Sequence, residues 1–163
     1  MSNKLEYKPL TIPKVQWNKK NLTETYGELV AQPLEPGFGV TLGNALRRIL
    51  LGSIEGSAIT AVIIQGVNNE FASIPNVVED VMQILLNIKG IVIKNSTGQA
   101  GSMTLHFKGQ GVAKAGDIQL DSHLTVVNPD HVIANVSAGG ELDIKFTVES
   151  GRGYQPAQWP AGK

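Results

Sequence analysis

The chain has 163 residues, and its 14 lysines and arginines balance its 14 aspartates and glutamates, which gives a formal charge of zero. This balance excludes a free-standing nucleic-acid-binding protein, which needs excess positive charge to neutralise phosphates, and the 42% share of hydrophobic residues excludes an acidic disordered chain. Because only 17% of the residues are charged, against about 25% in ordinary soluble domains, the composition is typical of a chain that works inside an assembly, although an ordinary neutral domain fits it too.

The N-terminal part of the chain contains three segments of different composition before the first predicted helix. Residues 1–24 are polar with scattered apolar side chains, and we expect them to be loosely ordered. Residues 26–33 predict a strand that is closed by prolines. A glycine-rich loop, 37–43, then leads into a helix.

This first helix is predicted from Leu42 to Leu51. Its apolar residues recur at the helical spacing and form one stripe, which consists of Leu42, Ala45, Leu46, Ile49 and Leu50. Thr41 is the expected N-cap and Gly52 the expected residue after the helix. The opposite side carries Asn44, Arg47, Arg48 and Leu51, so we expect that partners can contact the helix from both sides.

A β-branched run predicts a strand from Ser57 to Gln65. Pro75 then opens a second helix from Asn76 to Lys89, whose apolar set is Val77, Val81, Ile84, Leu85 and Ile88. We place Glu79 and Asp80 in its first turn and Lys89 in its last turn, where their charges complement the helix dipole, and Gly90 ends the helix.

After the second helix the hydrophobic period becomes two residues. Ile91–Ile93 predicts a strand, and two longer half-buried strands are predicted from alternating apolar residues, Met103, Leu105 and Phe107 in one and Leu142, Ile144, Phe146 and Val148 in the other. Glycines are expected at the turns: Gly98, Gly101, Gly109, Gly111, Gly116, Gly139 and Gly140. The prediction is an α+β fold with mixed or antiparallel sheets and two main helices.

No pattern in the sequence points to an active site. The glycines of residues 37–43 have one residue too many for a dinucleotide fingerprint, and no Gly-Lys-Ser/Thr follows, so a small nucleotide-binding enzyme remains only an alternative. His106, His123 and His131 pair with no histidine or carboxylate at metal-ligand spacing, and surface roles are expected for them. We expect no catalytic residue, no metal and no cofactor.

Two segments offer contact chemistry instead. Arg47 and Arg48 can bind carboxylates or backbone carbonyls of a partner, although an arginine pair on a helix is often merely solvated. Gly151-Arg152-Gly153-Tyr154 combines exposed backbone with residue types favoured at interfaces, although it can also be a simple strand-ending turn. An α+β adaptor therefore stays open beside the enzyme.

The chain has no cysteine, so disulfides and thiolate metal sites are excluded and an intracellular location is expected. The N-terminus lacks the apolar segment of a secretory signal. The longest apolar runs, such as Ala61–Ile64, fall far short of the ~20 residues of a membrane helix, and no membrane association is expected.

Four segments resemble, in the right order, the bacterial RNA polymerase alpha subunit. They are PLEPGFGVTLGNALRRILL at 33–51, EDVMQILLNIKG at 79–90, NPDHVI at 128–133 and GRGY at 151–154. They are distributed along residues 25–158, and the first segment alone is highly specific. The chain is thereby identified as a member of this family, in its N-terminal region.

The resemblance implies a non-catalytic scaffold subunit of a nucleotidyltransferase complex. Alpha subunits dimerise and recruit the large catalytic subunits, beta and beta-prime, for DNA-templated transcription, and they would meet DNA here only through the complex. Residues 1–54 would be the first segment of a dimerisation domain, 55–158 an inserted β-rich domain, and 159–163 the start of a return segment. The implied location is the bacterial cytoplasm, at the nucleoid within the polymerase, and a plastid is less favoured.

The resemblance also implies interface residues. The dimer interface would contain Phe38, Leu42, Leu46, Ile49 and Leu50. The large subunits would be contacted by Arg47, Arg48, Leu51, Lys89, Gly151, Arg152, Gly153 and Tyr154. In the family the chain returns to supply a second dimer helix, and a linker and a DNA-binding domain follow. We therefore expect the apolar stripe of the first helix to be partly exposed in this chain.

Overall fold

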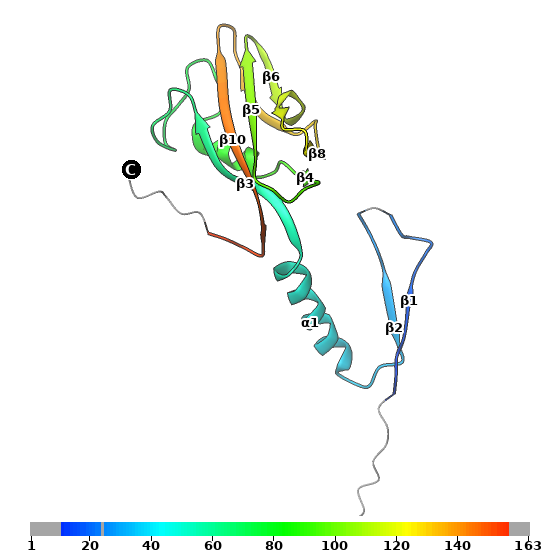
Figure 1. Cartoon of the computed structure of the whole chain (residues 1–163). Helices are drawn as coiled ribbons and strands as arrows, with labels where there is room; N and C mark the ends of the chain where they lie inside the picture. Colours follow the sequence, from blue (N-terminus) through cyan, green and yellow to red (C-terminus); the bar gives the residue numbers. More distant parts are fainter. Residues whose placement is uncertain (1–10, 24, 157–163) are drawn as a thin grey trace, which may run out of the picture. The chain divides into compact units, whose positions relative to one another are not determined.

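The computed structural model describes residues 11–23 and 25–156, and Figure 1 shows its helices and strands. The chain divides into two compact units, residues 1–52 and 53–163. The described residues form two α-helices, and every strand pairing between them is antiparallel. The predicted α+β class with antiparallel sheets is confirmed.

The first unit contains a hairpin and a helix. Strands β1 (Lys14–Trp17) and β2 (Leu29–Gln32) pair with each other alone. The strand predicted at 26–33 is confirmed as β2. The expectation that residues 1–24 are loosely ordered was wrong for β1, and residues 1–10 and 24 lie outside the described residues. Four residues with a weak alternation carry little signal by themselves, and β1 is a strand because Leu29–Gln32 lies opposite it.

Helix α1 spans Phe38–Gly52 and begins four residues before the predicted start. Gly37 has a φ of +84°, which glycine adopts readily, and this turn directs the chain into the helix. The amide of Thr41 already donates to the carbonyl of Gly37, so Thr41 lies in the first turn and is not the N-cap. The glycine loop expected at 37–43 was therefore wrong, because Gly39 and Gly43 are helical, and Gly52 is the last helical residue.

The second unit is built on a six-stranded antiparallel sheet with the order β7-β5-β10-β3-β4-β8. Its three long strands are β3 (Glu55–Ile64), β5 (Gly101–Lys108) and β10 (Glu141–Arg152), and its short strands are β4 (Ile93–Asn95), β7 (Gln119–Leu120) and β8 (Leu124–Val126). In Figure 1, β10 lies between β3 and β5. The predicted strands at 57–65 and 103–107 and the long C-terminal strand are confirmed.

The core lies on one face of this sheet. The alternating residues predicted to face inward are indeed buried, namely Met103, Leu105, Leu142, Ile144, Phe146 and Val148, and Phe107 is partly buried. The ribbon of β6 (Gly111–Lys114) and β9 (Val132–Val136), a short 3₁₀ turn η1 (Ala115–Asp117) and helix α2 (Val81–Ile88) complete the core. Helix α2 contributes Val81, Ile84 and Ile88 to it.

Helix α2 begins five residues after the predicted start at Asn76. Asn76 has a φ of +60°, and the next residue, Val77, forms a β-bridge with Val136. Asp80 is the N-cap, because its side chain accepts a hydrogen bond from the amide of Gln83 at 2.7 Å. The placement of Glu79 and Asp80 inside the first turn was therefore wrong, whereas the end near Lys89 and Gly90 is confirmed.

Three of the expected turn glycines are in regular structure. Gly101 and Gly111 lie in strands and Gly116 lies in η1, whereas Gly98, Gly109 and Gly139 have positive φ values that suit turns. At each of the first three, a Cβ would lie too close to a neighbouring residue. At Gly101, for example, a Cβ would be 2.8 Å from Nε2 of His123. These glycines therefore serve close packing. The strand predicted at 91–93 begins only at Ile93.

Glu79 ties the start of α2 to β9. Its carboxylate accepts hydrogen bonds from the backbone amide of Asn135 at 2.7 Å and from the side-chain amide at 2.6 Å. The Glu79→Ala variant leaves the Asn135 amide without a partner, and we expect the free energy of unfolding to fall by about 2 kcal/mol. Urea denaturation followed by circular dichroism measures this loss. Glu149→Ala removes an exposed carboxylate from β10 and serves as the control, with a change below about 0.5 kcal/mol.

Candidate protein-protein interface

The apolar residues of α1 are exposed along the whole helix. None of its side chains is buried, and the exposed fractions of the residues predicted for a dimer interface range from 36% at Leu42 to 60% at Leu50. Phe38, Leu46 and Ile49 fall between these values. Within residues 11–23 and 25–52, no side chain of any kind is buried. The first unit therefore presents an apolar helix face that its own described residues do not cover.

Small residues adjoin this apolar face. At about 100° per residue, Gly39 and Gly43 lie on the same side of α1 as Leu46 and Leu50. Each glycine in a helix interior costs roughly 1 kcal/mol relative to alanine, and a Cβ at Gly43 would meet no atom within 4 Å. The described chain therefore gives no packing reason for Gly43. A closely approaching partner would supply such a reason, because glycine lets another backbone come near.

The other side of α1 combines charge with two apolar residues. Arg47, Arg48 and Leu51 all lie away from the apolar face, and so does Val40, which lies about three helical turns before Leu51. All four are exposed. None of the ion pairs in the described part of the chain involves Arg47 or Arg48. This surface can therefore contact a second partner while the apolar face contacts a first.

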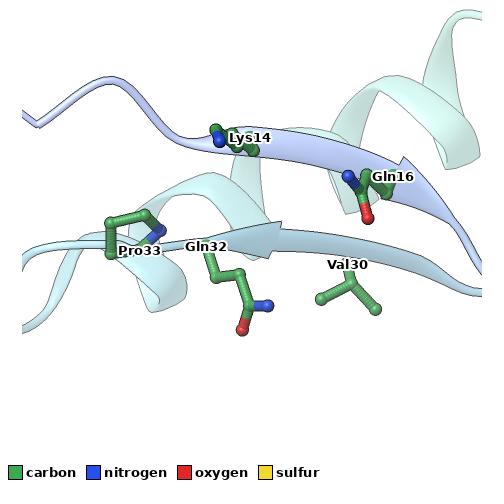
Figure 2. A pocket seen from close by; sticks show the side chains of 5 residues that line it. All are labelled: Lys14, Gln16, Val30, Gln32 and Pro33. Atoms are coloured by element: carbon green, nitrogen blue, oxygen red, sulfur yellow. The ribbon is translucent and has the colours of Figure 1, made fainter.

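The β1–β2 hairpin also has two unlike faces. Its more polar face is hollowed, and Figure 2 shows the lining residues Lys14, Gln16, Val30, Gln32 and Pro33. Only one of these five is ionisable, so the hollow contains no pair of groups suited to acid-base chemistry. The opposite face carries Val15, Trp17, Leu29 and Ala31, of which only Ala31 is partly covered. A hairpin of two strands is marginally stable at best in water without a partner.

In the second unit, the structure places Lys89 at the C-cap of α2. Its backbone amide donates to the carbonyls of Asn87 and Leu85, and its side chain is exposed. No ion pair within the described part of the chain involves Lys89. The ammonium group is therefore available to a partner.

The Gly151–Tyr154 segment lies where β10 ends. Gly151 and Arg152 are the last residues of the strand and pair with Gly56 and Glu55 of β3. Nη2 of Arg152 lies 3.1 Å from Oε2 of Glu55, in an ion pair of two exposed side chains. Gly153 has a φ of +65°, and Tyr154 is 89% exposed. The Arg152 guanidinium is thus partly engaged, whereas the Tyr154 ring is free to pack on another chain.

The histidines differ in part from the prediction. His106 is exposed, as predicted, and its Nδ1 lies 2.7 Å from Oδ1 of Asp143, because β5 and β10 bring these residues opposite each other. His123 and His131 are partly buried. Among the described residues, no group of three or more histidine, aspartate or glutamate side chains could hold a metal ion. No helix in the same residues is long and apolar enough to cross a membrane.

The chain is similar to proteins of one known family. Residues 62–160 match the model of the RNA polymerase Rpb3/RpoA insert domain. The chain is 47% identical over 144 residues to the DNA-directed RNA polymerase subunit alpha of Geobacter metallireducens, and 51% identical over 140 residues to that of Bifidobacterium adolescentis. These alignments cover 88% and 86% of this chain and 42% of each relative. The chain therefore spans about two fifths of the length of the curated relatives it matches.

Proposed function

This chain belongs to the RNA polymerase alpha-subunit family through its Rpb3/RpoA insert domain, and we propose that it is a non-catalytic assembly subunit of DNA-directed RNA polymerase. Its role is to associate with a second alpha subunit and to recruit the large catalytic subunits. The observation that supports this role best is the exposed apolar face of α1, next to a second face that carries Arg47, Arg48 and Leu51. The complex, and not this chain, performs nucleotidyl transfer and meets DNA.

In this proposal residues 1–54 are the first segment of the dimerisation domain, which corresponds to the first unit. Residues 55–158 are the inserted domain, which corresponds to the second unit. The apolar face of α1 packs against the second alpha subunit through Phe38, Leu42, Leu46, Ile49 and Leu50. Covering these side chains removes apolar surface from water, which stabilises the association by about 25 cal/mol per Å². Such a complex works in the bacterial cytoplasm.

The proposed contacts with the large subunits are contributed by both units. The first unit contributes Arg47, Arg48 and Leu51 of α1, and the second unit contributes Lys89 and the residues from Gly151 to Tyr154. Arginine suits such contacts because its planar guanidinium group can bind a carboxylate with two parallel hydrogen bonds. The nucleotide-binding alternative is not favoured, since the relatives are polymerase subunits and most of the supposed glycine loop is helical. The same relatives speak against an adaptor outside transcription.

The Arg48→Ala variant tests the proposed contact between α1 and the beta subunit. In the complete subunit, we expect its affinity for the beta subunit to fall roughly tenfold, or about 1.4 kcal/mol, while self-association stays unchanged. Co-purification from cells, with beta quantified against alpha, measures this effect. Lys145→Ala removes an exposed charge from β10 and is the matched control. Recovery of beta at the wild-type level with Arg48→Ala would remove Arg48 from the proposed contact.

A further inference from the structure

The turn of residues 128–131, Asn128-Pro129-Asp130-His131, is held against the carboxyl end of α2. The Asn128 side chain donates from Nδ2 to the carbonyl of Gly90 at 2.9 Å and accepts from the amide of Val92 at 2.9 Å. Nε2 of His131 lies 2.7 Å from the carbonyl oxygen of Asn87. Two side chains of one turn therefore bind the backbone on both sides of Lys89.

The last carbonyls of a helix lack the regular helical partner, and backbone turns or side chains bind them instead. Here the carbonyl of Asn87 accepts from the backbone amide of Gly90 at 2.9 Å, and the imidazole of His131 donates to the same oxygen from another part of the chain. The Asn87 side chain donates to the carbonyl of Ile133 in β9 at 2.9 Å, which ties the same turn of α2 to the ribbon.

The residue after Lys89 is a glycine because the His131 ring occupies the space beside it. A Cβ at Gly90 would lie 2.6 Å from Cε1 and 2.7 Å from Nε2 of that ring. On its other side, the turn is bound by the amides of η1: Ala115 donates to the carbonyl of His131 and Gly116 donates to that of Pro129, both at 2.8 Å. The 128–131 turn thus connects the end of α2 to η1.

We propose that Asn128 and His131 are positioning residues, which fix the carboxyl end of α2 so that Lys89 presents its ammonium group to a large polymerase subunit. This inference depends on the proposed function, because it needs Lys89 to be a contact. It assigns a role to the 128–131 motif, which otherwise has none. The backbone around Lys89 is bound from the 128–131 turn at Asn87, Gly90 and Val92, whereas the Lys89 side chain itself stays exposed.

The test is a double-mutant cycle in the full chain, with binding to the large subunits as the readout. His131→Leu removes the donor to Asn87, and we expect about fivefold weaker binding, the factor typical for the loss of one hydrogen bond. His131→Gln places an amide nitrogen where Nε2 lies and is expected to bind within about twofold of the wild type. In the Lys89→Ala background, His131→Leu is expected to cause no further loss, because it acts through Lys89.

A second variant covers the case in which His131→Leu does not fold. Asn128→Asp keeps the acceptor for Val92 and loses the donor to Gly90, and we expect it also to weaken binding about fivefold, again without effect in the Lys89→Ala background. Additive losses would overturn the positioning role, and so would wild-type binding by folded His131→Leu. If Lys89→Ala binds normally while Arg48→Ala does not, the inference fails and the proposed function stands. If both bind normally, the proposed contacts with the large subunits fail.

Discussion

Replacing Phe146 with alanine is expected to lower the free energy of unfolding of the second unit by about 3–5 kcal/mol. The Phe146 ring is 2% exposed on the central strand β10, where it lies opposite Met103 of β5 and Val62 of β3. Removal of the ring loses the free energy that is gained when a large apolar side chain is buried away from water. It also leaves a cavity that the neighbouring side chains fill only in part. Since a domain of this size is stable by only about 5–15 kcal/mol, much of its stability would be lost.

Urea denaturation followed by circular dichroism measures this change. Thr147→Ala is the matched control, because Thr147 is the next residue of β10 and its side chain is exposed. Its effect should remain below about 1 kcal/mol. A loss of less than about 1 kcal/mol for Phe146→Ala would show that this face of β10 does not form the core of the second unit.

The second large effect concerns self-association. In the complete subunit, Leu46→Glu places a carboxylate in the middle of the apolar face of α1, and we expect the dissociation constant of the dimer to rise at least about 100-fold. Burial of an ionised group without a partner costs several kcal/mol, and each 1.4 kcal/mol is a factor of ten in affinity. Sedimentation equilibrium over a range of concentrations measures this shift.

Leu51→Glu introduces the same side chain on the opposite side of α1, in a residue that is at least as exposed. We expect this variant to dimerise normally and to lose binding to the large subunits, because Leu51 lies on the same side of α1 as Arg47 and Arg48. The two variants therefore separate the two faces of one helix. Equal dimerisation by Leu46→Glu and the wild type would contradict the assignment of the apolar face.

Those parts of the fold that rest on local periodicity could be predicted from the sequence. The alternation in Met103–Phe107 and Leu142–Val148 identified the inward faces of β5 and β10, and the helical spacing of Val81, Ile84 and Ile88 identified the buried side of α2. In each case neighbouring residues encode the pattern, because a strand or a helix exposes its side chains at a fixed period.

The errors arose where a distant segment determines the local conformation. Helix α2 starts late because residues 77–78 bind β9: Val77 forms a bridge with Val136, and the amide of Val78 donates to the carbonyl of Asn135. Strand β1 depends in the same way on β2. Local propensity cannot show such pairings, since tertiary contacts override it.

Of the candidate interface, the apolar stripe on α1 follows from sequence spacing, and the structure shows it exposed. The contact residues on both sides are those that the family resemblance implies, and they stay a prediction. The hydrogen bonds that fix the end of α2 were not predictable, because they join Asn87 and Gly90 to residues about 40 positions later. Only the clash that a Cβ at Gly90 would cause with His131 shows why that glycine is needed.

Affinity capture of the tagged complete subunit from cells shows whether the protein is a scaffold that recruits the large polymerase subunits. The two large subunits are quantified relative to the captured chain, for the wild type and for the Leu46→Glu/Arg48→Ala double variant. We predict near-stoichiometric amounts of both large subunits with the wild type and a loss of at least about tenfold with the double variant. Folded wild-type protein that retains neither large subunit would show that the protein is not such a scaffold, and equal recovery with both proteins would show that Leu46 and Arg48 do not contribute to recruitment.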